Sequence, residues 1–379
     1  MIYLDHAAAT PLDQDVLAAM QPYFSDIFYN PSATYLPAKQ AREALQQARG
    51  IVAHWLGAKS SEVIFTAGGT EGNNIAIQGS MQKFPNCSAV ISGIEHDSVM
   101  LTAQKFNCSA ALTTEEGRVD LQDLQRKITD STVLVSVMYV NNEVGTIQPL
   151  FQIAEIIQKI RHERKKHGNT TPLYFHTDAC QAANYLNVRV KRLGVDLMTL
   201  NGGKLYGPKQ TGALYVASHV EIESSIHGGG QERGLRSGTE NVAGAVGFAS
   251  ALDKAQSIRQ AEAARLNDIK NEAIHLLTQK IPGVIINGSL KHRAPNNMHF
   301  TLPGHDNERV LVQLEERGIL AAAGSACSAS SGEPSHVLRA MSISDEAARS
   351  SLRVTMGRAT TDLDMQKFVQ VLTDITKSN

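Results

Sequence analysis

Short apolar runs alternate with longer amphipathic stretches between about residues 60 and 217. Most of these runs lack the period-two alternation of a half-exposed strand, which is typical of strands covered by helices on both faces. The stretch 153–167 places isoleucines at 153, 156, 157 and 160 on one face, as an amphipathic helix does. The expected strands lie at 63–66, 89–92, 133–138, 173–176, 196–200 and 213–216. This pattern predicts an α/β fold with a mainly parallel sheet.

The chain beyond residue 240 follows a different pattern. Residues 241–281 are rich in alanine, glutamine, glutamate, lysine and leucine and contain no proline, which predicts one long helix or two joined helices. A helix of ~40 residues is about 60 Å long, so we expect it to bridge two domains. Strands near 284–286, 297–302 and 352–355, with helices near 306–317 and 361–376, predict a smaller α+β domain.

The composition shows no strong charge bias. The 379 residues carry a formal net charge of −1, so no overall field would attract nucleic acid or a membrane surface. The cysteines stand at 87, 108, 180 and 327 without a CxxC motif, so we expect no metal site. The chain begins without an export signal and has no apolar run of the ~20 residues that a membrane span needs. These features predict a cytoplasmic protein with reduced thiols.

The loops after the expected strands hold the candidate chemistry, because ligands of open α/β sheets bind beyond the carboxyl ends of the strands. The strand at 63–66 is followed by AGGTEGNN at 67–74. Its glycines let backbone amides approach a ligand, and Thr70 adds a hydroxyl at the start of the next helix, which suits a phosphate. A tight strand-to-helix turn with an N-cap explains the segment alone equally well.

Two further loops carry an acid and an amine. Asp178 follows the strand at 173–176, and a carboxylate there could keep a pyridinium nitrogen protonated. Its alternative role is to cap the next helix. Lys204 follows the strand at 196–200 among glycines, where desolvation favours the neutral amine that forms a Schiff base. The alternative is an ordinary solvated lysine.

His96 and Asn142 lie in the loops after two more expected strands. The imidazole of His96 could stack on a planar ring, and Asn142 could bond a ring hydroxyl or a substrate carboxylate. Either side chain could instead serve only the local structure. Taken together, the five loops supply a phosphate cradle, a Schiff-base lysine, an acid for a ring nitrogen and a stacking group, which are the parts of a pyridoxal-phosphate site.

A set of motifs in one order covers the chain from about residue 2 to residue 375. They are DHAAATP at 5–11, NPS at 30–32, GTE at 69–71, EH at 95–96, NNEVG at 141–145, DACQ at 178–181, KLYGP at 204–208, HGGGQERGLRSGT at 227–239 and GSAC at 324–327. In these motifs the chain resembles the cysteine desulfurases of the class-V aminotransferase superfamily. The resemblance implies the fold of type I pyridoxal-phosphate enzymes: a mainly parallel seven-stranded sheet with helices on both faces, plus a smaller α+β domain.

The resemblance also implies domain boundaries and a role for each site residue. Residues 15–258 would form the large cofactor-binding domain, and residues 1–14 and 259–379 the small domain with the cysteine loop. Pyridoxal 5′-phosphate would be attached to Lys204, and Thr239 would reach the phosphate in the neighbouring subunit of a homodimer. The other expected contacts are Asp178 at the pyridine nitrogen, Gln181 at the ring oxygen, His96 on the ring face, Gly69, Thr70, Asn201 and Gly203 around the phosphate, and Asn142 and Arg353 at the substrate.

The resemblance further implies a sulfur-transfer reaction. Lys204 would remove the α-proton of L-cysteine, and Cys327 would attack the substrate sulfur and keep it as a persulfide, releasing alanine. The segment 321–332 around Cys327 is small, polar and glycine-containing, which favours a carrier loop over a buried core thiol. The other three cysteines match no family nucleophile and are interpreted as structural. The sulfur would pass to an iron–sulfur scaffold or another sulfur-relay protein.

One position departs from the family pattern. Members usually have Ser-Gly-His-Lys where this chain has Asn201-Gly202-Gly203-Lys204, so the imidazole beside the lysine is missing. The departure bears on turnover more than on cofactor binding. Two alternatives stay open from the sequence: a different pyridoxal-phosphate reaction on the same fold, such as transamination, and a catalytically degenerate subunit that serves in binding or assembly.

Overall fold

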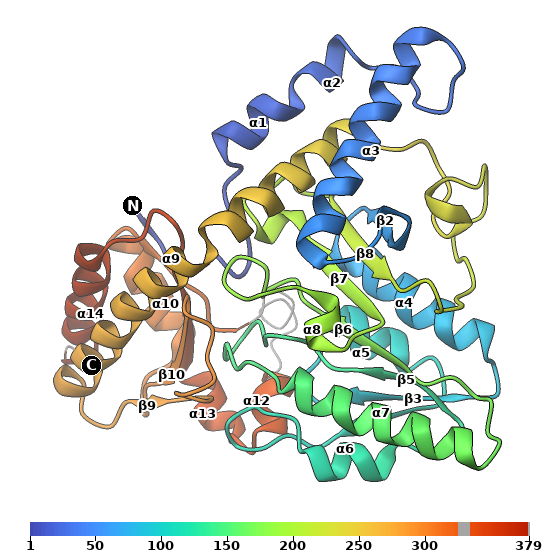
Figure 1. Ribbon diagram of the computed structural model, residues 1–379. Coiled ribbons are helices and arrows are strands. Elements are labelled where there is room, and N and C mark those ends of the chain that lie inside the picture. The colour runs from blue at the N-terminus through green and yellow to red at the C-terminus, as the bar shows by residue number, and fades with distance from the viewer. Residues whose placement is uncertain (325–333, 378–379) are drawn as a thin grey trace.

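The computed structural model describes residues 1–324 and 334–377, and within them the central sheet has seven strands (Figure 1). The strands are β2 (Val63–Thr66), β3 (Ser88–Ser92), β4 (Cys108–Ala111), β5 (Thr132–Ser136), β6 (Tyr174–Asp178), β7 (Leu197–Asn201) and β8 (Gly212–Val216). Their order is β2-β8-β7-β6-β5-β3-β4. β8 is antiparallel to both neighbours, whereas the pairs from β7 to β4 are parallel. The predicted mainly parallel sheet is confirmed.

Helices flank this sheet (Figure 1). They are α3 (Leu36–Leu56), α4 (Gly69–Lys83), α5 (Asp97–Ala103), α6 (Leu121–Lys127), α7 (Leu150–Lys166) and α8 (Val190–Leu193), with 3-10 turns η1 (Ser60–Glu62), η2 (Gly202–Lys204) and η3 (Glu232–Gly234). α1 (Gln14–Met20) and α2 (Pro22–Ser25) pack instead on the long helix at 242–280. α4 lies across the sheet and contacts β2, β5, β6, β7 and β8. The large hydrophobic core forms between the sheet and these helices, with β5 buried along its whole length. This packing explains why the strand sequences do not alternate.

The predicted long helix is one continuous element, α9 (Val242–Lys280), of 39 residues. Its first half packs into the large core through residues such as Phe248 and Leu252. Its second half packs into a separate core through Leu266 and Leu277. α9 therefore joins the two parts of the molecule, as Figure 1 shows.

The second core belongs to a smaller α+β unit. Its three-stranded antiparallel sheet has the order β12-β10-β9. Its elements are β9 (Ile285–Ile286), β10 (Asn297–Thr301), α10 (Asn307–Glu316), β11 (Ile319–Leu320), α12 (His336–Ala340), α13 (Asp345–Arg349), β12 (Ser351–Thr355) and α14 (Asp362–Lys377). The N-terminal strand β1 (Ile2–Tyr3) pairs with β11, so the first residues lie on this unit. The domain boundaries at 15 and 258 stay predictions.

Three local expectations were inaccurate. The edge strand β4 was not predicted, because Cys-Ser-Ala-Ala offers little apolar bulk and pairs on one side with β3. α4 begins at Gly69, so residues expected in a loop form its first turns. β6 and β7 extend to Asp178 and Asn201, which therefore end strands instead of following them. None of the helices in the described part of the chain combines the length and apolar character needed to span a membrane.

Candidate active site

A cavity of about 280 Å³ lies where the strands of the large sheet end and the small unit begins. Its position beyond the carboxyl ends of β6 and β7 is the one expected for open α/β sheets. It is lined by Ala7, Ala8, Gly69, Thr70, Asn73, His96, Ser98, Met138, Val140, Asn142, Asp178, Cys180, Gln181, Asn201, Lys204 and Arg353.

The cavity brings together most of the residues singled out from the sequence. Those that line it are Gly69, Thr70, His96, Asn142, Asp178, Gln181, Asn201, Lys204 and Arg353. Gly203 and Thr239 do not line it. A Cβ atom at position 203 would face Asn201 Oδ1 at 3.4 Å and Lys209 Cγ at 3.7 Å. Cys327 lies outside the described residues.

Lys204 is the last residue of η2, the turn that follows β7. Its Nζ donates a hydrogen bond to the carbonyl oxygen of Ala8 in the N-terminal segment. Burial lowers the pKa of the Lys204 ammonium, because the charged form loses solvation. Burial therefore shifts Nζ toward the neutral amine, which is the nucleophilic form.

Asp178 is the last residue of β6 and is 6% exposed. Its Oδ2 accepts a hydrogen bond from Asn73 Nδ2 at 2.7 Å, and its Oδ1 accepts one from the backbone N–H of Cys180 at 2.9 Å. These two donors fix the orientation of the Asp178 carboxyl group. The wall of the cavity thus carries an oriented anion suited to a protonated ring nitrogen.

The start of α4 forms a part of the cavity wall that favours an anion. Its N-cap is Gly68, with φ 126°, a residue that has no side chain to cap the first turn. The first amide groups of a helix point out of its end and favour an anion there. A Cβ atom on Gly69 would lie 2.7 Å from Cys180 Sγ, so a side chain at this position would collide with the cavity wall. The cavity therefore joins an anion cradle, a buried amine and a buried carboxylate, and this donor set fits pyridoxal phosphate.

Arg353, on β12, closes the side of the cavity that the small unit provides. It is 2% exposed, and its Nη2 pairs with Asp5 Oδ1 at 2.7 Å. Its Nη1 donates to the backbone oxygen of Asn142 at 3.1 Å. Its Nε has no partner among the described residues. A guanidinium held in this way presents donors to a carboxylate.

Three residues of the cavity wall were missed or assigned differently in the sequence. Asn73 and Ser98 line the cavity, and Cys180, interpreted as structural, lines it too. Burial raises the pKa of the Cys180 thiol, so this sulfur stays protonated. Asn73 lies three residues after Thr70, so a helix starting at Gly69 would have placed both on one face.

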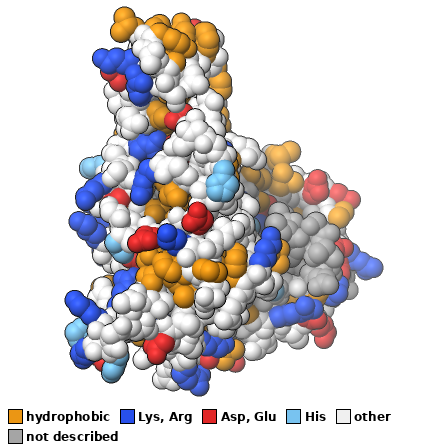
Figure 2. All heavy atoms as spheres, turned by 90° about the vertical axis from the view of Figure 1, so that its right-hand side faces the viewer, with side chains coloured by type: hydrophobic (Ala, Val, Ile, Leu, Met, Phe, Trp, Pro, Cys, Tyr) orange, Lys and Arg blue, Asp and Glu red, His pale blue; other side chains and the backbone are white. Residues whose placement is uncertain are grey.

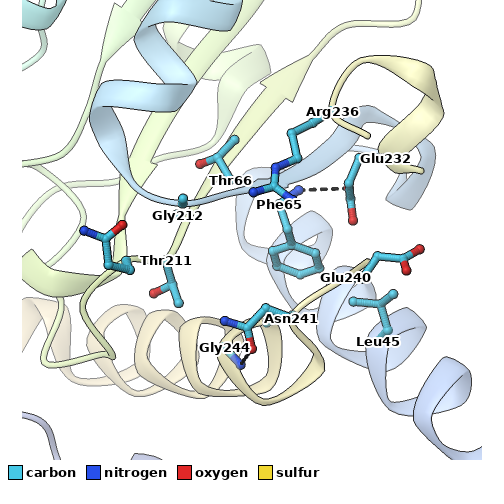
Figure 3. A pocket seen from close by; sticks show the side chains of 13 residues that line it. Leu45, Phe65, Thr66, Thr211, Gly212, Glu232, Arg236, Glu240, Asn241 and Gly244 are labelled. Carbon is cyan, nitrogen blue, oxygen red and sulfur yellow. Dashed lines mark hydrogen bonds between the residues drawn. The ribbon is translucent and has the colours of Figure 1, made fainter. Parts of the chain in front are cut away.

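Figure 3 shows a smaller cavity of about 100 Å³ between β2, β8, α3 and the start of α9. Its wall includes Glu232, which accepts the N–H of Phe65 at 2.9 Å and pairs with Arg49 at 2.6 Å. Arg236 in the same wall pairs with Glu71 at 2.8 Å. These contacts anchor the segment 227–239, so we interpret this cavity as part of the packing under that segment.

The family model for aminotransferase class-V matches residues 2–368. A cysteine desulfurase IscS from Dictyoglomus turgidum is 38% identical over 378 residues, which cover 98% of this chain and 93% of that protein. A protein of the same name from Methanosarcina thermophila is 38% identical over 381 residues, covering 99% of this chain and 91% of its own.

Solved structures agree with these matches. A NifS-like protein superposes with a TM-score of 0.91 at 28% identity, and the match covers 100% of both chains. A structure described as SspA in complex with cysteine has a TM-score of 0.80 at 34% identity, covering 94% of this chain and 99% of its own. This chain therefore belongs to the class-V aminotransferase family, whose cofactor is pyridoxal 5′-phosphate.

Proposed function

We propose that this protein is a pyridoxal-phosphate-dependent cysteine desulfurase, a sulfurtransferase that converts L-cysteine to L-alanine and keeps the sulfur as a persulfide on Cys327. The observation that carries the proposal is the cavity in which Lys204, Asp178 and Arg353 meet the uncapped start of α4. Its support comes from relatives named cysteine desulfurase and from a similar solved protein in complex with cysteine.

The residues of the cavity would hold the cofactor in one orientation. The first amides of α4 at Gly69 and Thr70, with Asn201, would surround the phosphate. Lys204 would be the point of covalent attachment, and His96 would lie against the ring. Asp178 would face the ring nitrogen and Gln181 the ring oxygen. When bound, pyridoxal phosphate supplies an electron sink for charge released at the substrate α-carbon.

Lys204 would also move the proton in the reaction. Its lowered pKa shifts Nζ toward the neutral amine, which is the form that can take a proton. The bond from Nζ to Ala8 oxygen fixes the amine on the wall of the cavity. We assign Nζ as the base that takes the α-proton of the amino acid.

Arg353 and Asn142 would bind the substrate carboxylate. The guanidinium is buried and oriented by Asp5, and its Nε is without a partner in the described residues. Charge-assisted hydrogen bonds from a guanidinium to a carboxylate are short and directional. This arrangement supports an α-amino acid as the substrate class.

The sulfur step would form one bond and break one. The Cys327 thiolate attacks the substrate sulfur, the S–S bond forms, the Cβ–S bond breaks, and its electron pair passes to carbon, which is then protonated. L-cysteine and the Cys327 thiol thus become L-alanine and a persulfide without an external oxidant. An acceptor protein, an iron–sulfur scaffold or another sulfur relay, would then take the outer sulfur.

We propose a homodimer as the active unit. Thr239 is exposed and lies outside the cavity of its own chain, on the segment that Glu232 and Arg236 anchor. This supports a contact of Thr239 with the cofactor phosphate of the partner subunit.

Figure 2 shows apolar side chains gathered at the tip formed by α2 and the start of α3, where Phe24 and Leu36 are 63% and 81% exposed. An exposed apolar patch of this kind supports a protein interface.

Absorbance spectroscopy tests the cofactor half of the proposal. The purified protein should be yellow, and Lys204→Ala should lose the absorbance band of the covalently bound cofactor. A wild-type protein that stays colourless after addition of pyridoxal phosphate would instead favour a degenerate assembly subunit.

A cysteine comparison tests the sulfur half. Cys327→Ala should abolish sulfide and persulfide formation and leave the cofactor absorbance intact. Cys108→Ala is the matched control, because this thiol lies on β4 and does not line the cavity. Undiminished sulfur release by Cys327→Ala would refute the proposal, and formation of a keto acid from L-cysteine would favour a transaminase.

A further inference from the structure

Four side chains form a continuous line of hydrogen bonds along the wall of the cavity. Asn73 Nδ2 lies 2.7 Å from Asp178 Oδ2 and 2.8 Å from Ser98 Oγ. Ser98 Oγ in turn lies 2.8 Å from His96 Nδ1. Asn73 is 1% exposed and Ser98 is 9% exposed, so water competes little for these bonds.

The chemistry of the groups fixes the direction of each hydrogen bond. The Asp178 carboxylate, charged when it faces a protonated ring, accepts only, so the neighbouring atom of Asn73 must be the NH₂ group. This group gives its second hydrogen to Ser98 Oγ. The hydroxyl, which already accepts from Asn73, then directs its own hydrogen to His96 Nδ1.

His96 receives a second donor at the same nitrogen. It is the N-cap of α5, and its Nδ1 accepts the backbone N–H of Ser98 at 3.1 Å. A ring nitrogen that accepts hydrogen bonds carries no hydrogen, so the neutral imidazole must carry its hydrogen on Nε2. The ring N–H of His96 is therefore at Nε2, where it can donate to another acceptor.

We propose that Asn73 and Ser98 are positioning residues that hold His96 as the Nε2–H tautomer, so that the imidazole donates a hydrogen bond to the amino-acid substrate and does not act as its base. The chain of bonds also ties His96 to Asp178 at a fixed separation. The identity of the substrate rests on the proposed function, whereas the tautomer follows from the hydrogen bonds alone. A histidine that only caps a helix would need the backbone N–H of Ser98 but not Asn73.

Nitrogen-15 NMR of the histidine ring tests the tautomer directly. At about pH 8.5, where an ordinary imidazole is neutral, cofactor-free and cofactor-loaded wild type should both show hydrogen on Nε2 of His96. Ser98→Ala should show a measurable fraction of the Nδ1–H form, and Ser98→Thr, which keeps the hydroxyl, should behave like wild type. Hydrogen on Nδ1 in the wild-type protein would overturn the proposal.

Kinetics and visible circular dichroism test the positioning role. Ser98→Ala removes the hydroxyl that bonds His96, and a fall in kcat of about five- to tenfold is expected, with KM changed about twofold at most. Asn73→Ala removes the bonds to both Ser98 and Asp178, and its kcat should fall at least as far. The dichroism of the bound cofactor should weaken in both variants. Unchanged kcat and dichroism in both would refute the role.

Asn74→Ala is the matched control for these measurements. Asn74 is the neighbouring residue on α4, and its Nδ2 bonds to the backbone oxygen of Thr70 at 2.9 Å outside the cavity. It should keep the wild-type kcat and dichroism, and an equal loss in Asn74→Ala would show a merely structural effect. If the wild type releases no sulfur from cysteine, the proposed function fails while the NMR result still decides the tautomer.

Discussion

Replacing Glu95 with glutamine removes a buried acid that lies directly before His96. The Glu95 side chain is 0% exposed, and burial raises the pKa of its carboxyl from 4.5 to about 8. Its Oε1 accepts hydrogen bonds from Ser92 Oγ and, at 2.7 Å, from the N–H of Met138. Its Oε2 has no partner in the described chain. A glutamine can keep both bonds at Oε1, so Glu95→Gln removes the titrating proton and keeps the shape of the side chain.

The sign of the effect follows from the two protonation states. The unfolded carboxyl loses its proton near its ordinary pKa of 4.5, whereas the folded carboxyl keeps its proton to about pH 8. Folding therefore takes up a proton between these values, and the free energy of unfolding falls as the pH rises through this window. From pH 6 to pH 8 the loss is roughly 3 kcal/mol, at about 1.4 kcal/mol per pH unit. Above pH 8 the loss levels off.

Urea titrations at pH 6 and pH 9 measure this contribution. Protein and pyridoxal phosphate concentrations are held constant, because cofactor binding and association also stabilise the fold. Wild type should lose roughly 3 kcal/mol more than Glu95→Gln between the two pH values. Identical losses in the two proteins would show that Glu95 does not hold its proton in the fold, and the reasoning from its burial would fail.

Three further changes have defined outcomes. Gly203→His should fit, since the nearest contact of a Cβ there is 3.4 Å, and kcat for cysteine turnover should rise about three- to tenfold, with pyridoxal-phosphate binding changed about twofold at most. Asp5→Asn removes the charge that faces the buried Arg353 and should lower the free energy of unfolding by roughly 1–3 kcal/mol in urea titrations. A hydrogen bond to Asp196 raises the pKa of His219. The stability that protonated His219 contributes is therefore complete below pH 6.5 and is lost as the pH rises through the folded-state pKa. His219→Ala should lower the melting temperature at pH 6 and not at pH 9.

The sheet could be predicted because its signal is local. Buried strands are continuous apolar runs, and these runs located β2, β3, β5, β6, β7 and β8. Each predicted strand end lies within two residues of the observed one. The edge strand β4 carries small residues and was missed for that reason. The start of α4 was placed too late, because glycines read as a loop although the uncapped helix begins among them.

The site could be predicted only as far as each group belongs to the end of its own strand. Asp178 ends β6 and Lys204 follows the adjacent strand β7, so the rule for parallel sheets brings them together. The pairing of Arg353 with Asp5 joins positions 348 residues apart, and no local pattern contains it. Asn73 and Ser98 are 25 residues apart, and their bond depends on how α4 and α5 pack. Such contacts are set by tertiary structure.

The continuity of α9 has a consequence for how the molecule comes apart. Its 39 residues run from the large core into the small one, and helix formation is cooperative along such a length. Trp55, the single tryptophan, donates a hydrogen bond from Nε1 to Asp253 in the first half of this helix at 2.7 Å. Unfolding of the small core should unwind α9 from its second half toward the hydrogen bond between Trp55 and Asp253. Tryptophan fluorescence and a probe placed on α14 should therefore report one shared transition instead of two.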